Sequence, residues 1–362
     1  MVRFGIVGVG IMGRGHAKRF FEERIPGAVL TAVCDLDPAC LAWAKEKDEN
    51  IATFETSTAM LDSGLVDAIM VSTPHYDHPI IAMEAFERKI HVLIEKPAGV
   101  FTKNVREMNE KAATAGVVFG IMYNQRTNPM FKKMREMVQN GEIGELKRTS
   151  WLITDWYRPQ AYYNGDGWRA SWKGEGGGVL INQCPHNLDL WQWICGMPKR
   201  VTAFAHNGKW HDIEVEDDVT AYVEYENGAT GVFITSTADC PGNNRFEVLG
   251  DLGKLVCENG DLVHYKLDIS EREFNRTNTE MFARPNAERI VVDCPGDYPQ
   301  HTGVFVDFVK AINGEGEMVA RGEEGIDGLT ISNAMHLSSW LGKTVELPLD
   351  EDLFKAELEK RF

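Results

Sequence analysis

The sequence predicts an α/β protein of two domains. An N-terminal domain, residues 1–125, is expected to carry a doubly wound parallel sheet, and a C-terminal α+β domain, residues 126–362, a large, mostly antiparallel open sheet. In the first third, strand-like apolar runs alternate with helical patterns, the order of βαβ units. Beyond about residue 125, strands follow one another without helices, which favours antiparallel pairing. A length of 362 residues is typical of about two domains.

The first thirty-five residues organise the N-terminal domain. Val2–Val7 is an apolar run of strand length, and it leads directly into the spacing G-x-G-x-x-G over residues 8–13. Arg14–Arg24 reads as a helix that Pro-Gly ends, and Val29–Cys34 reads as a second strand. A glycine triplet between a strand and a helix, with Asp35 about twenty residues further on, predicts a dinucleotide-binding Rossmann domain.

Each residue of the glycine turn has a physical reason. Gly8 permits the tight turn, Gly10 lets the backbone approach a pyrophosphate, and Gly13 lets helix and strand pack closely. Ile11 and Met12 stand where the helix N-terminus offers unpaired N–H groups to the phosphates. The alternative is a tight strand-to-helix turn with a solvated Asp35.

Asp35 is expected to select the cofactor. Its carboxylate can accept hydrogen bonds from ribose hydroxyls, and it would repel a 2′-phosphate. The residues that follow it, 36–38, include no arginine that could neutralise such a phosphate. NAD is therefore favoured over NADP.

Composition excludes several classes of partner. The formal net charge of −16 argues against nucleic acid and anionic membranes, which require a basic face, but it leaves an anionic substrate possible. No apolar run approaches the length of a membrane-spanning helix, so a cytoplasmic protein is expected. Cys184, His186 and Asp189 lack a second pair at zinc-ligand spacing, so no metal is expected.

In the rest of the first domain the predicted strands and helices alternate. Helices are expected over Pro38–Lys47, Pro79–Arg88 and Thr102–Ala115, and strands over Val66–Val71, His91–Ile94 and Val117–Ile121. Ligands of parallel sheets bind beyond the carboxyl ends of the strands. Five polar segments fall at such ends and are expected to line one crevice: Gly8–Gly13, Asp35, Ser72–His78, Glu95–Pro97 and Tyr123–Arg126.

The second domain is expected to be rich in strands. Helices are predicted over Phe131–Asn140, Val179–Ile194, His301–Asn313 and Gly325–Leu341, and strands over Leu146–Trp156, Val201–Ala205, Val219–Tyr225, Ala229–Thr235, Phe246–Leu249, Lys254–Cys257 and Leu262–Leu267. One face of the sheet can take the helix at Val179–Ile194. The other face is expected to form a homo-oligomer, a dimer or tetramer.

Taken together, these motifs resemble the Gfo/Idh/MocA family of glucose–fructose oxidoreductase, inositol dehydrogenase and relatives. The resemblance is carried, in order, by the glycine turn, by Ser72-Thr73-Pro74 with His78, by Glu95-Lys96-Pro97 and by the segment 176–189, which reads GGGVLINQCPHNLD. It spans nearly the whole chain. The combination of E-K-P with G-G-G…H-x-x-D is far more specific than the glycine turn. The resemblance implies hydride transfer between NAD(P) and a secondary alcohol of a sugar or cyclitol.

Removing hydride from a C–H bond requires the neighbouring hydroxyl to lose its proton, so a base and a cation are needed beside it. Lys96, at a strand end, is the candidate cation; the alternative is a solvated loop lysine. His186 is the candidate base, since imidazole titrates near neutrality and the start of a helix disfavours imidazolium; the alternative is a core histidine. Asn182 stands where many family members carry Asp, so it cannot relay a proton as that Asp would.

The remaining site residues are expected as follows. Cofactor contacts are predicted for Gly8, Gly10, Ile11, Met12, Gly13, Asp35, Ser72, Thr73, Pro74, His75, His78, Glu95, Lys96, Asn124, Trp168 and Arg169, and substrate contacts for Lys96, Tyr123, Arg126, Asp155, Tyr157, Tyr163, Asn182 and His186. The aromatic loop over residues 155–169 mixes rings with hydrogen-bonding groups, which suits sugars. An aromatic patch buried between domains or subunits is the alternative.

These residues predict an NAD-dependent dehydrogenase of a sugar, glycoside or cyclitol, with C3 of a glucose-like pyranoside as the preferred position. Two alternatives stay open. In one, NAD stays bound and is recycled, so that the enzyme oxidises, eliminates and re-reduces, or exchanges hydride between two sugars. In the other, the protein is a non-enzymatic sugar or NAD sensor.

Overall fold

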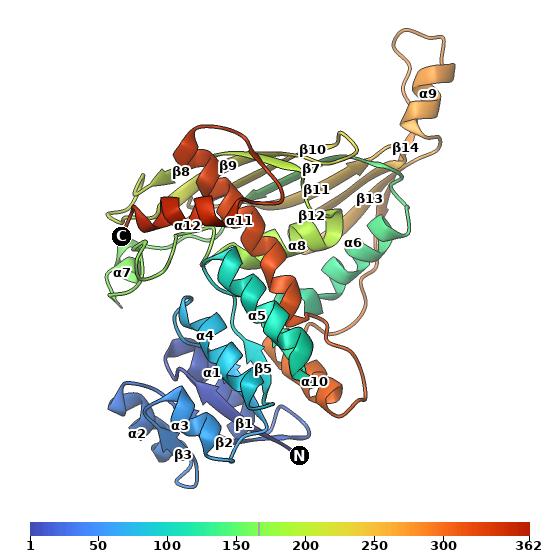
Figure 1. The fold of residues 1–362 in the computed structure, drawn as a ribbon. Helices are drawn as coiled ribbons and strands as arrows, with labels where there is room; N and C mark the ends of the chain where they lie inside the picture. Colours follow the sequence, from blue (N-terminus) through green and yellow to red (C-terminus); the bar gives the residue numbers. More distant parts are fainter. Residues whose placement is uncertain (166) are drawn as a thin grey trace. The chain divides into compact units, whose positions relative to one another are not determined.

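The computed structural model describes residues 1–165 and 167–362; Asp166, in the aromatic loop, lies outside the described residues. Two compact units make up the chain (Figure 1). Unit 1 comprises residues 1–127 and 298–329, and unit 2 comprises residues 128–297 and 330–362. The boundary predicted at 125/126 assigns residues 298–329 to the second domain, whereas this segment packs within unit 1.

Unit 1 is built on six parallel strands in the order β3-β2-β1-β4-β5-β6. They are β1 (Val2–Val7), β2 (Ala28–Cys34), β3 (Ala52–Phe54), β4 (Ala68–Val71), β5 (His91–Ile94) and β6 (Phe119–Ile121). The parallel Rossmann sheet predicted from the alternating pattern is thus confirmed. Strand β3 was not predicted, because a three-residue strand leaves too short a pattern.

The helices of unit 1 connect these strands. They are α1 (Ile11–Phe21), α2 (Pro38–Lys47), α3 (Ser57–Asp62), α4 (Asp77–Glu87), α5 (Thr102–Ala115) and α10 (Gln300–Ile312), with short 3₁₀ turns η1 (Asn124–Thr127) and η2 (Gly322–Glu324). Helix α1 begins at Ile11, three residues before the expected start at Arg14, so residues 11–13 form its first turn.

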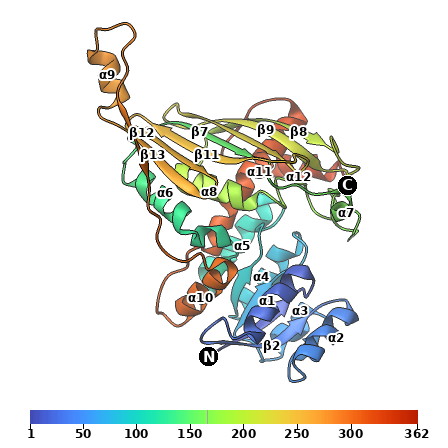
Figure 2. The same cartoon turned by 180° about the vertical axis from the view of Figure 1, so that it is seen from behind.

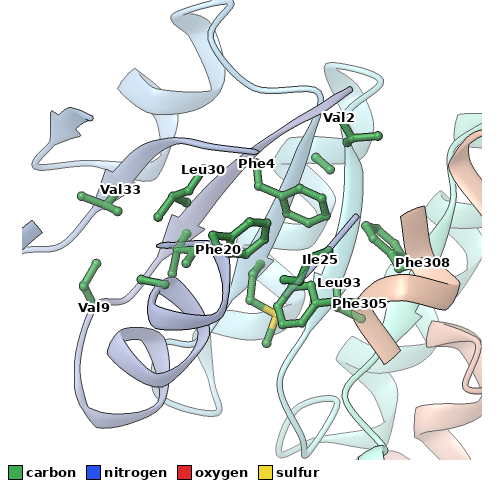
Figure 3. Close-up of a cluster of buried hydrophobic side chains, with 14 of the residues drawn as sticks. Val2, Phe4, Val9, Phe20, Ile25, Leu30, Val33, Leu93, Phe305 and Phe308 are labelled. Carbon is green, nitrogen blue, oxygen red and sulfur yellow. The ribbon is translucent and has the colours of Figure 1, made fainter. Parts of the chain in front are cut away.

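The core of unit 1 explains why α10 belongs there. Phe4 of β1 lies 5.0 Å, centroid to centroid, from Phe20 of α1 and 5.9 Å from each of Phe305 and Phe308 of α10. Figure 3 shows these four rings gathered against the sheet. Burial of each ring is worth roughly 1.5–3 kcal/mol, so α10 supplies apolar cover that the preceding helices leave incomplete.

Unit 2 carries a nine-stranded sheet in the order β14-β13-β12-β11-β7-β10-β9-β8-β15. The strands are β7 (Leu146–Ile153), β8 (Arg200–Asn207), β9 (Glu216–Glu224), β10 (Thr230–Ser236), β11 (Asn244–Gly250), β12 (Gly253–Glu258), β13 (Asp261–Leu267), β14 (Ala287–Val291) and β15 (Val345–Glu346). Strands β7 and β10 pair in parallel and the other neighbours pair antiparallel, so the mostly antiparallel sheet is confirmed.

The helices of unit 2 are α6 (Pro129–Gln139), α7 (Gln160–Tyr163), α8 (Pro185–Cys195), α9 (Glu271–Thr277) and α12 (Glu351–Glu359); the division between units falls within α11 (Gly325–Leu341). Helix α9 stands beyond β13 and β14, away from the rest of unit 2 (Figures 1 and 2). The expected helix Val179–Ile194 was wrong at its start. Residues 179–183 form turns in which the Gly178 carbonyl accepts hydrogen bonds from Ile181 and Asn182, and Pro185 then begins α8.

The two faces of the unit 2 sheet differ. On one face, Trp191 of α8 stacks on Phe233 of β10, and Phe131 of α6 packs against Trp151 of β7. The other face exposes apolar side chains on neighbouring strands, namely Phe204, Tyr222 and Val232. Assembly of copies through this face stays a prediction. Within residues 1–165 and 167–362, no helix is long and apolar enough to cross a membrane.

Candidate functional site

The predicted site residues of unit 1 meet at one edge of its sheet. The last residues of four neighbouring strands are in register: Val7 pairs with Cys34 on one side and with Val71 on the other, and Val71 pairs with Ile94. Gly8, Asp35, Ser72 and Glu95 therefore follow directly at the same carboxyl edge. Four of the five polar segments thus stand at one edge of the sheet, as expected; that all five line one crevice stays a prediction.

The three glycines of the turn have different surroundings. Gly8 has a φ of 86°, and a Cβ there would lie 2.7 Å from the Ser72 carbonyl oxygen. A Cβ at Gly13 would lie 1.9 Å from the Gly8 carbonyl oxygen. Around the Cβ position of Gly10, by contrast, no atom of the described residues lies within 4 Å. The fold requires the first and third glycines, while the second borders open space at the start of α1.

The start of α1 is suited to an anion. Gly10 is its extended N-cap, and no described side chain caps it. Ile11 and Met12 are 77% and 42% exposed, although both are apolar. The first N–H groups of a helix carry no intrahelical partner, and the helix dipole adds positive potential there. This geometry fits a pyrophosphate.

Asp35 closes the turn from the end of β2. Its Oδ2 accepts a hydrogen bond of 2.6 Å from the Val9 N–H, and its Oδ1 accepts one of 2.9 Å from the Asp37 N–H. The carboxylate is partly exposed, and the neighbouring Leu36 is 86% exposed. Asp35 thus stands beside the glycine turn, where a ribose can reach it.

Three residues predicted to contact the cofactor carry buried polar atoms that have no hydrogen-bond partner among the described residues: Ser72 Oγ, Thr73 Oγ1 and Asn124 Oδ1. Unsatisfied buried polar atoms cost free energy and are uncommon in folded proteins. Ser72 and Thr73 follow β4, and Asn124 opens η1 after β6. Their position along this edge fits a ligand with several hydrogen-bonding groups, such as a dinucleotide.

His78 joins two of the strand-end loops. Its ring is fully buried, with Nδ1 2.8 Å from the Pro97 carbonyl oxygen and Nε2 2.8 Å from the Thr73 carbonyl oxygen. Burial lowers the pKa of His78, while the hydrogen bonds to those two carbonyls raise it. His75, also buried, has its ring centroid 6.1 Å from that of His78. The predicted role of His78 in the cofactor site therefore acts through the backbone that it holds.

Glu95 is the buried anchor of the E-K-P segment. Its Oε1 lies 2.7 Å from Nε2 of His16, a buried residue of α1, and its Oε2 accepts a hydrogen bond of 3.0 Å from the Lys96 N–H. Burial alone would raise the pKa of Glu95, but the hydrogen bond and charge of His16, helped by Lys96 and His301, lower it to about 2. Glu95 is therefore a carboxylate that fixes the backbone of Lys96 against the helix of the glycine turn.

Arg126 lies in η1 with a guanidinium that is 1% exposed. It forms an ion pair with Glu324 and lies over the ring of Tyr123, 5.5 Å from the centroid. Tyr123 is also 1% exposed. The sequence predicts substrate contacts for both, whereas their burial within unit 1 favours a structural ion pair.

In unit 2, the glycine triplet leads into α8. Pro185 is the first residue of the helix and His186 the second, as expected from the proline. His186 is partly exposed at this positive end of the helix. Asp189, one turn further on, is buried and accepts a hydrogen bond of 3.2 Å from Gln192 Nε2.

Asn182 has a partner that sequence reasoning missed. Its side-chain Nδ2 donates to Oε1 of Glu175, and Oε2 of Glu175 accepts a hydrogen bond of 2.7 Å from the Ala170 N–H. Glu175 is 2% exposed. Burial raises the pKa of Glu175 to about 7, against the hydrogen bonds from Ala170 and Asn182 and the charge of Arg169. In the sequence, the one feature that distinguishes Glu175 is its position immediately before three glycines.

The aromatic loop contributes partly exposed side chains. Asp155 is exposed, and Tyr157 is 46% exposed. The Tyr163 hydroxyl donates to Thr237 Oγ1 at 2.9 Å, and burial raises the pKa of Tyr163 to about 12. Arg169 lies 4.7 Å over the ring of Trp168. The site residues of unit 2 thus come from this loop, the turn at 178–183 and the start of α8.

Fold and site together define a protein that binds a dinucleotide at the edge of a parallel sheet and carries a separate sheet domain. Two family profiles match the chain: "Oxidoreductase family, NAD-binding Rossmann fold" over residues 2–123 and "GFO/IDH/MocA C-terminal domain" over residues 131–256. The chain belongs to the GFO/IDH/MocA family and is an NAD-binding oxidoreductase. The resemblance noted in the sequence and the predicted cofactor are thereby confirmed.

Relatives of known name agree with this assignment. The myo-inositol 2-dehydrogenase of Thermotoga maritima is 28% identical over 71% of this chain and 75% of its own length. The D-glucoside 3-dehydrogenase of Escherichia coli is 25% identical over 96% and 97% of the two chains. Among solved structures, the WlbA dehydrogenase of Bordetella pertussis in complex with NADH and UDP-GlcNAcA has a TM-score of 0.82, with 25% identity over 96% of this chain and 99% of that chain.

Proposed function

We propose that this protein oxidises a secondary alcohol of a sugar, glycoside or cyclitol with NAD. The observation that carries the proposal is the position of Lys96. It follows β5 at the carboxyl edge that also holds the glycine turn, and Glu95 fixes its backbone. A lysine whose backbone is held beside a dinucleotide site can bring its ammonium to the alcohol that is oxidised. Inositol and glucoside dehydrogenases among the relatives support this substrate class.

The residues predicted to hold NAD are the turn Gly8–Gly13, Asp35, and the polar groups of Ser72, Thr73 and Asn124. When bound, NAD supplies the acceptor for the hydride. Lys96 binds the reacting hydroxyl through its ammonium. Its charge favours the alkoxide that develops as the C–H bond breaks, and so lowers the barrier. Glu95 and His16 keep the segment that carries Lys96 in place.

His186 is the proposed base. It takes the hydroxyl proton on its imidazole, and the positive end of α8 favours the neutral ring that this step needs. Asn182 carries an amide, so it binds and orients without exchanging a proton. In the reverse direction the imidazolium returns the proton to the carbonyl oxygen. The proposal requires Lys96 and His186 to act on the same oxygen.

The aromatic loop supports a sugar-like ring. Tyr157 and Trp168 offer apolar faces, and Asp155 and Arg169 offer hydrogen bonds and charge. Sugars and cyclitols present apolar C–H faces with polar rims, so this mixture suits them. A C3 hydroxyl of a glucose-like pyranoside stays the preferred position among the possibilities.

The test is NADH formation, followed by absorbance, across inositols, free hexoses, glycosides and sugar acids. We expect reduction of NAD with at least one cyclic polyol, and weaker reduction of NADP. If no compound yields NADH although the protein binds NAD, net dehydrogenation is excluded. Solvent deuterium appearing at a ring carbon of the substrate would then indicate oxidation and elimination with recycled NAD. Transfer of deuterium from a C–D-labelled donor sugar to an added keto sugar would indicate hydride exchange, and the absence of both would favour the sensor.

A further inference from the structure

The strongest unassigned feature is the buried carboxyl of Glu175, which the mechanism above does not use. It is 2% exposed, and its two oxygens accept hydrogen bonds from different groups: Oε2 from the Ala170 N–H and Oε1 from the Asn182 amide. Burying a carboxyl group costs free energy, so a buried carboxyl hydrogen-bonded to a side-chain amide indicates a functional or structural role.

The chemistry of the pair fixes the orientation of the amide. A carboxylate accepts hydrogen bonds and cannot donate them, so it selects the NH₂ end of an amide. The Asn182 amide therefore turns Nδ2 toward Glu175, and its carbonyl oxygen Oδ1 lies at the opposite corner of the planar group. Without Glu175, the two ends of the amide would be nearly equivalent in shape, and either could face the reacting groups.

We propose that Glu175 is a positioning residue for Asn182: by holding the NH₂ end of the amide, it makes Oδ1 the acceptor that Asn182 offers to the reacting hydroxyl or its imidazole base. This inference rests on the proposed function. It explains how an asparagine serves where the resemblance leads one to expect an aspartate, since Oδ1 accepts a hydrogen bond as a carboxylate oxygen does. No proton is transferred by the pair.

The charged and titratable groups around Glu175 make the arrangement sensitive to pH. Arg169 favours the carboxylate, whereas the buried Glu216 opposes it, and Tyr163 lies near enough to feel the charge. Glu216 is itself held by the Gly178 and Leu180 N–H groups and by His336 Nε2, at 3.0 Å. When Glu175 takes up a proton it can donate to Oδ1, and the preference for one orientation of the amide is lost.

The kinetic test exchanges the two groups. Glu175→Gln should lower kcat about tenfold, the scale of one hydrogen bond lost in the transition state, with little change in the KM for NAD. Asn182→Asp should place two carboxyls in contact, so that activity falls as pH rises and their shared proton is lost. The double variant E175Q/N182D restores one carboxyl and one amide, and should recover most of the loss and the original pH profile.

A further variant separates positioning from a general structural role. In an Asn182→Ala background there is no amide to orient, so Glu175→Gln should cost nothing further in kcat. Wild-type kcat in E175Q, an equal loss in the N182A background, or no recovery in the exchanged double variant would each overturn the proposal. Thermal unfolding of each variant identifies any loss that reflects misfolding alone.

A measurement without substrate keeps this test separate from the proposed function. The ¹⁵N side-chain amide signal of Asn182, assigned by its absence in N182A, should shift as pH crosses the titration of Glu175, and should not shift in E175Q. If wild type oxidises no polyol but this titration is seen, the proposed function fails and the pairing stands. If no titration is seen, the pairing itself is wrong.

Discussion

The imidazole of His16 and the carboxylate of Glu95 form a buried pair, with Nε2 2.7 Å from Oε1. His16 belongs to α1, the helix that begins at the glycine turn, and Glu95 holds the backbone of Lys96. The pair therefore links the predicted pyrophosphate site to the residue proposed to polarise the alcohol. A substitution of His16 or Glu95 should therefore affect both NAD binding and oxidation of the alcohol.

Glu95→Gln should destabilise the protein in a pH-dependent way. The folded-state pKa of Glu95, about 2, is below its ordinary value of 4.5, so its contribution is complete above about pH 4.5 and is lost as pH falls toward 2. The shift corresponds to about 3 kcal/mol. In urea unfolding, the stability difference between wild type and variant should shrink by about this amount between pH 7 and pH 2, mostly below pH 4.5. A difference independent of pH would contradict the assignment.

Gly10→Ala and Gly13→Ala form a matched pair. A methyl group at residue 10 meets only open space, so the variant should fold normally but bind NAD at least about tenfold more weakly, because the methyl occupies the approach of the pyrophosphate. At residue 13 the methyl meets the Gly8 carbonyl, so stability should fall by roughly 1–3 kcal/mol or more. Thermal unfolding and NADH fluorescence titration separate the two effects. Normal NAD affinity in G10A would place the cofactor elsewhere.

Asp35→Asn tests cofactor selection. The asparagine Oδ1 can keep the hydrogen bond from the Val9 N–H, whereas its NH₂ cannot accept from the Asp37 N–H, and the negative charge that repels a 2′-phosphate is gone. The ratio of kcat/KM for NAD to that for NADP should fall about tenfold, in line with removal of one nearby charge. An unchanged ratio would show that selectivity lies in other residues.

Arg126→Met tests whether this arginine is structural. Removing the buried guanidinium takes away the ion pair with the partly exposed Glu324, which keeps its contacts with Arg321, and should cost about 1–3 kcal/mol in the free energy of unfolding. The double variant R126M/E324M should recover part of that loss. Full stability combined with a raised KM for the polyol would instead support the substrate contact expected from the sequence.

Much of the fold could be read from the sequence because its signals are local. Apolar runs alternating with helical patterns define the unit 1 sheet, and Pro185 marks the start of α8. The packing of α10 within unit 1 depends on Phe305 and Phe308 meeting a strand about 300 residues earlier, and no local pattern carries that information.

The candidate site also contains residues that the sequence reveals and residues that it does not. Gly8, Asp35 and Lys96 stand at strand ends, which a sequence reveals. The partners of other site residues cannot be recognised in the sequence. His16, which pairs with Glu95, lies on the apolar face of a helix, and Glu175, which pairs with Asn182, lies within a glycine-rich loop. Arg126 was predicted to contact a ligand because the sequence nearby shows no carboxylate for it. Its partner in the fold, Glu324, is nearly two hundred residues away along the chain.

Lys96 and His186 are proposed to act on one alcohol beside bound NAD, and the whole mechanism depends on that convergence. The direct test is a double-mutant cycle of NADH formation with Lys96→Met, His186→Ala and the combined variant, using the polyol that wild type oxidises fastest. Each single change should lower kcat about 100-fold or more with NAD affinity retained, and the combined variant should be little worse than the weaker single one, because the groups serve one proton transfer. Losses that multiply, or a single variant that keeps wild-type kcat, would contradict the claim.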